Sequence, residues 1–208
     1  MTKRLEAGAL KKASEAAIKG WAGHEGALAS ELQTTTKISE AFLKRWLSCW
    51  MLARSNPVSF RPALAEFLSV RARTRIVRAN DDEVPAIVSS LATEIFTAGA
   101  AKTKQTSLIS KFAFSLRPET VAPYDRRARI GLGKRYGISI NDHDFDEYFK
   151  CFERFLREAE ECLDAIGLTS DLRFKWEPLM SEKLFKMRTA DKYLMLEGGF
   201  REDLMQKC

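Results

Sequence analysis

Hydrophobic residues recur at helical spacing along most of the chain, whereas the strict alternation of a half-buried strand is nearly absent. The clearest case is residues 145–163, where a long apolar stripe falls on one face of a helix. Such stripes are the buried faces of amphipathic helices. We therefore expect an all-α fold, a compact multi-helix globular protein. The predicted helices cover residues 3–21, 39–50, 62–76, 81–99, 105–116, 125–136, 142–167, 178–187 and 191–196.

Polar residues, proline and glycine mark several of the helix ends. Ser39 and Asp125 stand where an N-cap residue would accept a hydrogen bond from the first helical turn. Pro118 stops the preceding helix, and Gly137 supplies the left-handed residue that often closes one. Residues 119–124 are thus predicted to form an extended loop between two helices.

Length and composition fit one globular domain. The chain has 208 residues, of which 45% are hydrophobic and 30% charged, enough to bury a core. We expect a single all-α domain over residues 1–208, and a division into two helical lobes stays open. No apolar run is long enough to span a membrane, and the polar N-terminus lacks the apolar core of a signal peptide. These features predict a cytoplasmic protein with no membrane partner.

Cysteines and histidines offer little for metal or redox chemistry. The four cysteines are scattered and form no Cys-x-x-Cys pair, so neither a zinc knuckle nor an iron–sulfur cluster is indicated. His143 lies between Asp142 and Asp144, where the start of a helix explains the acids better than a metal does. We expect no metal and no cofactor, so any catalysis would depend on carboxylates, lysines or hydroxyls.

Positive charge is concentrated in one segment. The formal net charge is +6, but residues 102–135 alone hold nine Lys and Arg against two acids, which gives +7. The rest of the chain is therefore nearly neutral. Such a concentration favours an anionic partner, and nucleic acid is the first candidate because lysine and arginine bind phosphates. The candidate nucleic-acid-binding residues are Lys111, Arg117, Tyr124, Arg126, Arg127, Arg129, Lys134 and Arg135.

One acid, Asp125, stands in the middle of this basic segment. Pro123 forces an extended backbone just before it, so Asp125 falls at the first turn of the next helix. Its ordinary role would be to cap that helix. Alternatively, a carboxylate among lysines and arginines stays ionised and can stabilise a cation or activate a nucleophile. The two roles are compatible.

The same stretch resembles part of a known family. Residues 110–119 (Ser-Lys-Phe-Ala-Phe-Ser-Leu-Arg-Pro-Glu), residues 121–125 (Val-Ala-Pro-Tyr-Asp) and residues 134–137 (Lys-Arg-Tyr-Gly) are similar to one part of the helix-hairpin-helix DNA glycosylases. In that family a loop ending in Val-Pro-x-Asp leads into a helix that carries Arg. The family's hairpin motif, Leu-Pro-Gly-x-Gly, is absent, but Gly99 lies near the corresponding place. The resemblance implies an all-α fold whose DNA-binding and catalytic region is residues 97–137.

The resemblance also implies roles for individual residues. Asp125 would be the catalytic carboxylate that stabilises the cationic sugar as the base leaves. Bifunctional members use a hairpin lysine that forms a Schiff base with the sugar. Lys104 and Lys102 lie at comparable distances before Asp125 and are the candidates, with Lys111 third. A lysine in an apolar, cationic pocket would be nucleophilic.

Two functional hypotheses follow from these observations. In the first, the protein binds double-stranded DNA, flips a damaged or modified base and cleaves its N-glycosidic bond with Asp125, while Tyr124 stacks on the base. In the second, it is a non-catalytic all-α protein that binds nucleic acid, with a regulatory or defence role. Whether the chain is an enzyme, with or without associated lyase activity, is left open between them.

Overall fold

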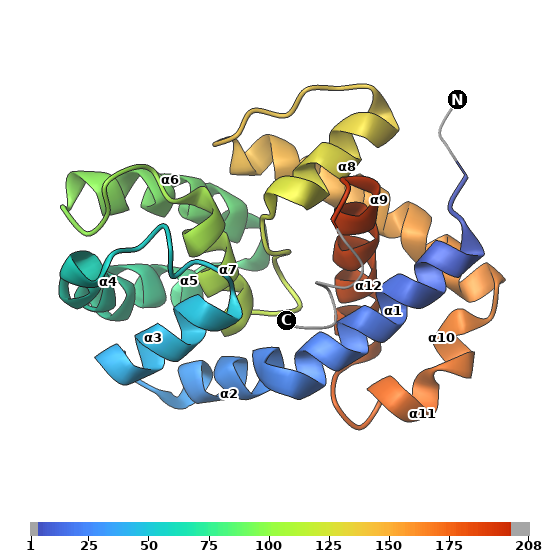
Figure 1. The fold of residues 1–208 in the computed structure, drawn as a ribbon, viewed down its shortest axis with the longest axis horizontal. Helices are drawn as coiled ribbons and strands as arrows, with labels where there is room; N and C mark the ends of the chain where they lie inside the picture. Colours follow the sequence, from blue (N-terminus) through green and yellow to red (C-terminus); the bar gives the residue numbers. More distant parts are fainter. Residues whose placement is uncertain (1–3, 201–208) are drawn as a thin grey trace. The chain divides into compact units, whose positions relative to one another are not determined.

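Helices form over most of the chain in the computed structural model, which describes residues 4–200 (Figure 1). The protein is 73% helical, and its described residues contain no strand. The all-α class predicted from the hydrophobic pattern is therefore confirmed. None of the described helices is both long enough and apolar enough to cross a membrane.

The helices form two compact units. The first unit contains residues 4–26, 124–142 and 147–200, and the second contains residues 27–123 and 143–146. The basic segment identified in the sequence is divided between them, because the boundary falls between Pro123 and Tyr124. Asp125 consequently belongs to the first unit, and Lys102, Lys104 and Lys111 belong to the second.

The first unit is built around its last long helix, α12 (Glu182–Glu197), which packs against α1 (Ala7–Gly20) and α8 (Arg126–Tyr136) (Figure 1). Side chains on every face of α12 are buried from Leu184 to Met195. The other elements of this unit are a π-helical turn at Trp21–Glu25, most of α9 (Phe145–Ala165), α10 (Leu168–Asp171) and α11 (Arg173–Trp176).

Two glycines let α8 and α12 approach each other closely. A Cβ atom at Gly131 of α8 would overlap the backbone of Leu194, and one at Gly198, just after α12, would lie 2.7 Å from the carbonyl carbon of Arg127. Neither position has room for a side chain. The backbone of α12 thus directly supports the helix that begins next to Asp125.

The second unit has α7 (Thr106–Leu116) at its centre, packed against α6 (Val84–Thr97) and α5 (Arg73–Arg78). The core of this unit includes an edge-to-face contact of Trp46 with Phe112, whose ring centroids lie 6.0 Å apart. Its other elements are α2 (Gly26–Thr34), α3 (Glu40–Cys49), a 3-10 turn at Val58–Phe60, α4 (Arg61–Phe67), a π-helical turn at Leu68–Ala72 and a 3-10 turn at Asp81–Glu83.

Helix ends predicted from local residue chemistry are confirmed. The Ser39 hydroxyl accepts a hydrogen bond from the Phe42 N–H at 3.1 Å, which caps α3. Gly137 ends α8 in the left-handed conformation, with φ of 66°. These ends depend on one residue and its immediate neighbours, which is why the sequence identifies them.

Several predicted boundaries differ from the structure. The separate helices expected at 178–187 and 191–196 are one continuous helix, α12, because the polar residues between them are buried without breaking it. Helical structure that was expected to stop at residue 21 continues through the π-helical turn into α2. The helix expected at 62–76 is interrupted by a second π-helical turn. The beginning predicted at residue 3 lies outside the described residues.

Candidate functional site

Asp125 is the N-cap of α8. Its backbone is extended, with φ of −125° and ψ of 140°, and its carboxylate Oδ1 accepts a hydrogen bond from the Arg127 N–H at 2.8 Å. The preceding loop, residues 121–124, is buried, whereas Asp125 itself is half-buried. The predicted cap is thus confirmed, and the carboxylate is held in place while part of it stays accessible.

Tyr124 anchors the loop that leads to Asp125. Its hydroxyl donates a hydrogen bond to the carbonyl of Asp142 at 2.7 Å, and its ring packs edge-on against Tyr148 at a centroid distance of 4.8 Å. Burial, with the charges of Asp142 and Asp125, raises the pKa of Tyr124 to about 12. The Tyr124 ring, which was expected to stack on a flipped base, therefore packs against Tyr148 within the first unit.

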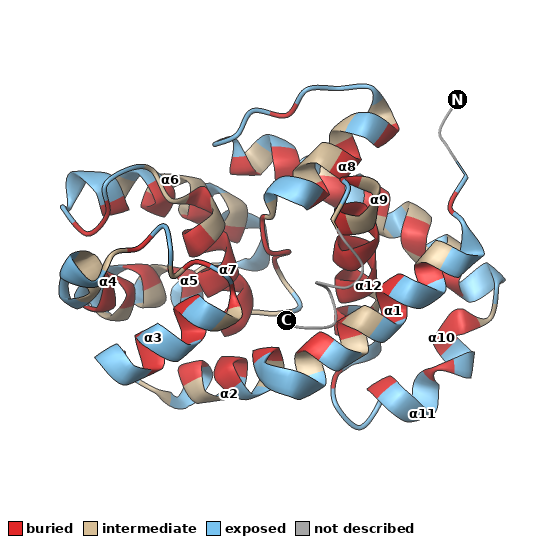
Figure 2. Cartoon of the chain, viewed as in Figure 1, coloured by how far each residue is buried: buried red, intermediate tan, exposed pale blue. Residues whose placement is uncertain are grey.

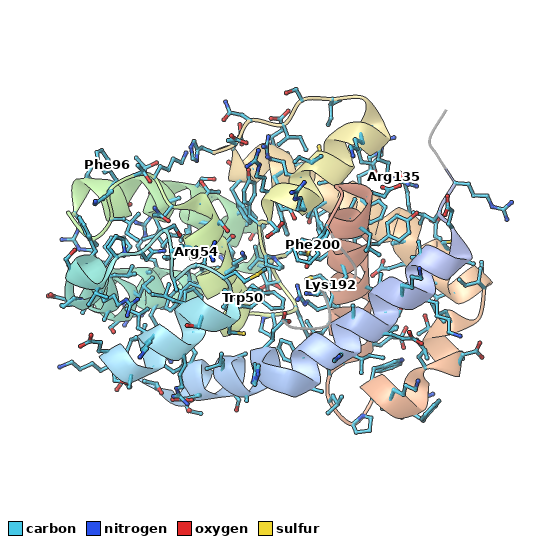
Figure 3. All side chains as sticks on the ribbon, viewed as in Figure 1. Trp50, Arg54, Phe96, Arg135, Lys192 and Phe200 are labelled. Carbon is cyan, nitrogen blue, oxygen red and sulfur yellow. The ribbon has the colours of Figure 1, made fainter. Side chains whose placement is uncertain are left out.

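The first unit also contains four buried charged side chains. Arg188 of α12 donates to both carboxylate oxygens of Glu25, at 2.6 and 2.7 Å, and to Asp191 Oδ2 at 2.6 Å. Lys192, labelled on α12 in Figure 3, lies 3.6 Å from Glu25 Oε1. Each of the four residues is at most 4% exposed. We call Glu25, Arg188, Asp191 and Lys192 the buried charge cluster.

The two acids of the buried charge cluster respond to it in opposite directions. Burial alone would raise the pKa of Glu25, but Arg188 and Lys192 outweigh it, so that the pKa lies below its usual value. For Asp191 burial prevails over Arg188 and Lys192, and the charges of Asp125 and Glu25 add to it, so that the pKa rises to about 6. The difference arises because Glu25 takes two hydrogen bonds from Arg188 and Asp191 takes one.

Tyr148 of α9 belongs to the same electrostatic environment. It is fully buried, and burial together with the charges of Asp191 and Asp125 raises its pKa well above the usual value. Asp125, Asp191 and Tyr148 therefore act on one another electrostatically within the first unit. Sequence reasoning identified Asp125 but neither of its two neighbours.

The sequence contains only a weak signal for the buried charge cluster. Arg188, Asp191 and Lys192 stand at i, i+3 and i+4, so that they share one face of a helix, but this spacing alone does not distinguish a buried cluster from an exposed polar face. Glu25 could not have been found in this way, because the π-helical turn at Trp21–Glu25 shifts the register that the sequence pattern assumes.

In the second unit, α6 and α7 form a two-helix hairpin joined by residues 98–105. Gly99 has φ of 68°, and the hydrogen bonds Gly99 N–H to Phe96 (3.0 Å) and Ala100 N–H to Ile95 (3.0 Å) form a Schellman motif. Within residues 4–200, the N–H groups of residues 101–104 donate to no acceptor. The turn thus combines available backbone donors with the two exposed or half-buried lysines of its sequence, Lys102 and Lys104.

The three lysines named as nucleophile candidates lie in different surroundings. Lys102 is exposed, with its ammonium 5.9 Å from the Phe60 ring centroid, and Lys104 is half-buried with no ion-pair partner among the described residues. Lys111 is only 6% exposed; its Nζ donates to the Trp50 carbonyl at 3.4 Å and lies 5.8 Å from the Trp50 ring centroid. Nothing in the local sequence indicates that Lys111 is the buried lysine of the three.

Two arginines of the basic segment are neutralised by acids outside it. Arg117 pairs with Asp81 and also donates to two carbonyls at the end of α5. Arg129 pairs with Asp142 and donates to the carbonyl of Ile140. Both guanidinium groups therefore tie their own segment to a neighbouring one.

A third arginine, Arg135, is labelled on α8 in Figure 3 and is buried. It lies 3.4 Å from a carboxylate oxygen of Glu158 and 3.5 Å from one of Glu197, with its guanidinium 5.1 Å from the Phe155 ring centroid. With Arg117 and Arg129 it reduces the charge that the segment offers to a partner well below +7. A formal charge count over residues 102–135 misses this neutralisation, because all of these acids lie outside the segment.

The remaining cations of α8 are exposed. Arg127 donates to the carbonyl of Gly198 at 3.3 Å and Lys134 to that of Glu197 at 3.2 Å, whereas no described residue pairs with Arg126. A backbone carbonyl does not neutralise a cation, so these three side chains keep their charge for an anionic partner.

The comparisons with known proteins do not assign a class to this arrangement. No protein-family model matches the chain, and neither a curated protein nor a solved structure matches it. The described residues also contain no group of three or more His, Cys, Asp or Glu placed to hold a metal ion. Function is therefore argued from Asp125 with its buried neighbours and from the hairpin of the second unit.

Proposed function

We propose that the protein is a base-excision enzyme of the DNA glycosylase type, acting in the cytoplasm, in which Asp125 is the catalytic carboxylate. The observation that carries this proposal is the placement of Asp125. Its carboxylate is fixed by the α8 cap, is half-buried, and has a second carboxyl group, Asp191, in its electrostatic environment. A fixed, partly desolvated negative charge stabilises a cation that develops beside it.

In the proposed reaction the bond between C1′ of the sugar and the base nitrogen breaks, and the bonding electrons leave with the base. The sugar then carries positive charge, which Asp125 stabilises. If water adds at C1′, it loses a proton and an abasic site remains. If a lysine adds instead, a Schiff base forms and the strand can break afterwards. Lys104 and Lys102, the candidates that the family resemblance implies, stay predictions; both are accessible in the hairpin turn of the second unit, whereas Lys111 is buried.

DNA binding in this proposal depends on two features, each within one unit. The hairpin turn offers N–H donors and two lysines, a combination that suits a phosphate. The exposed cations of α8, Arg126, Arg127 and Lys134, offer further phosphate contacts. The contacts predicted for Lys111, Arg117, Arg129 and Arg135 stay predictions, and each of these side chains would exchange an internal partner for phosphate.

The decisive experiment tests base release with Asp125→Asn. The protein is incubated with duplexes that bear damaged or modified bases and is then treated with alkali, which cleaves the strand at abasic sites. Asparagine caps helices as well as aspartate does, so this variant should fold normally and lose at least 100-fold in rate. Asp171→Asn is the matched control, because Asp171 is an exposed acid of the same unit. Equal activity of Asp125→Asn and the wild type would overturn the assignment.

A lysine nucleophile is tested by trapping with borohydride, which reduces a Schiff base to a stable covalent adduct with DNA. We expect adducts to be lost in Lys104→Ala or Lys102→Ala. Base release without any adduct in the wild type would show that water is the nucleophile.

The second candidate function is non-catalytic nucleic-acid binding. It is favoured by the confirmed cap, which by itself explains an acid at position 125. This candidate predicts DNA affinity that falls steeply with salt, with no base release from any duplex. Absence of DNA binding even at low salt would contradict both candidates.

A further inference from the structure

The hairpin turn of the second unit lies next to an aromatic side chain that the proposed function does not use. The ammonium of Lys102 lies 5.9 Å from the centroid of the Phe60 ring, which brings the 3-10 turn at Val58–Phe60 beside the hairpin turn. Both segments belong to the second unit. Residues 58–61 and 98–105 therefore form one surface, which we call the hairpin face.

The hairpin face carries cations that no acid neutralises. Among the described residues, Arg61, Lys102 and Lys104 have no ion-pair partner, and the Nε of Arg61 donates to no acceptor. The sequence around them, residues 41–65 and 95–118, contains no aspartate or glutamate. Unlike the arginines of the basic segment that pair with acids, these three side chains keep their charge for an anionic partner.

A short, rigid segment presents the aromatic side chain of the hairpin face. The 3-10 turn follows Pro57, and Pro62 stands in the first turn of α4, so that proline fixes the backbone on both sides of Phe60. The Phe60 ring is half-buried, and the neighbouring Val58 is 62% exposed. The hairpin face thus combines accessible apolar groups with free positive charge and with the N–H donors of its turn.

We propose that the hairpin face binds single-stranded DNA, with phosphates at the turn and an unpaired base stacked on Phe60. A nucleotide carries a phosphate and an aromatic base side by side, as the face carries Lys102 and Phe60. Proteins that bind single strands combine cations with aromatic side chains in this way. In a duplex the bases already stack on one another, so Phe60 adds affinity only for unpaired nucleotides. The inference shares the phosphate contacts of the turn with the proposed function but needs neither Asp125 nor base release.

Fluorescence anisotropy of labelled DNA measures the preference of the whole chain. The three probes are a single-stranded thymidine oligonucleotide, a blunt-ended duplex, and a strand of the same length whose bases are replaced by abasic sites. At equal salt the wild type should bind the thymidine oligonucleotide most tightly. Phe60→Leu keeps an apolar side chain but removes the aromatic face. It should lose about fivefold or more in affinity for the thymidine oligonucleotide and stay within about twofold of the wild type on the other two probes.

Phe174→Leu is the matched control, because Phe174 is an exposed ring of the first unit with the ammonium of Lys175 5.6 Å from its centroid. It should bind all three probes like the wild type, and Phe60→Tyr, which keeps an aromatic face, should do so as well. Circular dichroism establishes which variants are folded. Unchanged binding by Phe60→Leu, or an equal loss on all three probes, would overturn the inference. If Phe60→Leu does not fold, equal affinity of the wild type for the thymidine and abasic strands overturns it instead.

Lys102→Ala tests the phosphate contact at the turn. It should weaken binding of the thymidine and abasic strands alike and reduce the dependence of log affinity on log salt by about 0.7. An unchanged salt dependence would overturn the placement of phosphate at the turn. Base release separates this inference from the proposed function. Stacking on Phe60 without base release from any duplex would refute the proposed function alone, whereas base release without a preference for the thymidine oligonucleotide would refute the inference alone.

Discussion

The central helices of the two units, α7 and α12, are both buried on all sides, but they bury different chemistry (Figure 2). In α7 the buried side chains are apolar or hydroxyl-bearing except for Lys111. In α12 the same complete burial includes Arg188, Asp191 and Lys192. A helix that is apolar all round is the ordinary centre of a helical unit, and α7 comes nearer to that description than α12, because its buried polar side chains other than Lys111 are hydroxyls.

The difference shows that burial alone does not account for α12. Apolar groups are favoured in a protein interior, whereas buried ion pairs often add nothing to stability compared with apolar residues of similar volume. The charges of α12 therefore fit a role in specificity or function rather than in stability.

The largest effect is expected for Arg188→Met. This change leaves Glu25 and Asp191 buried without their shared partner, which costs about 3–5 kcal/mol of unfolding free energy. Urea unfolding measures the loss. Arg173→Met is the control, because Arg173 forms an exposed pair with Glu177, and such pairs contribute little to stability. Equal losses in the two variants would show that the cluster is not a special feature of α12.

In α7 the matching change is Leu108→Ala. Leu108 is fully buried, and removing such a side chain costs about 2–4 kcal/mol through lost burial and the cavity left behind. The same unfolding experiment measures this loss, which should be the same at pH 5 and pH 7 because no charge is involved. A loss that depends on pH would contradict the view that Leu108 stabilises the unit through apolar burial alone.

The unfolding free energy is expected to depend on pH through the titration of Asp191. Its folded pKa, about 6, lies above the unfolded value of 3.8, so the folded state holds this proton more tightly. The resulting stabilisation is complete below pH 3.8 and is lost as pH rises through 6, by roughly 2–3 kcal/mol in all. Glu25 has a lowered pKa and acts in the opposite direction, at lower pH.

Asp191→Asn isolates this contribution. The difference in unfolding free energy between the variant and the wild type should change between pH 4.5 and 7, in favour of the variant as pH rises. Urea unfolding at several pH values gives the difference. A constant difference across this window would show that Asp191 is ionised in the folded protein throughout.

The smallest effect concerns the start of α8, which packs on α12. Asp125→Ala removes the cap and should cost about 1 kcal/mol, whereas Asp125→Asn should stay within a few tenths of a kcal/mol of the wild type. Thermal or urea unfolding distinguishes them. A large loss in Asp125→Asn would mean that the charge of Asp125, and not its cap, supports the fold.

Local features could be predicted from the sequence, and features that depend on distant residues could not. The caps at Ser39 and Asp125 and the left-handed Gly137 depend on a few neighbouring residues, and the structure has all three. The continuity of α12 could not be predicted, because its charged residues normally indicate an exposed helix end. Partners distant in sequence hold them inside: Glu25 lies 163 residues before Arg188.

The basic segment also shows that features which depend on distant residues cannot be predicted from the local sequence. Counting charges along the chain treats Arg117 and Arg135 like Lys102, but the structure pairs the first two with acids and leaves the lysine exposed. Asp81 and Glu158, the partners of these arginines, lie 36 and 23 residues away in sequence. A basic stretch therefore gives an upper bound on the charge that is available to a partner.

The close approach of α8 and α12 at their two glycines also determines where Asp125 stands. A single added methyl group at Gly131 or Gly198 would push one backbone away from the other, and Asp125 stands at the end of the displaced helix. Any substitution at these two positions therefore displaces α8, and Asp125 with it, while every acid of the first unit is kept. Under the proposed function, alanine at either position would therefore lower the rate of base release although Asp125 itself is kept.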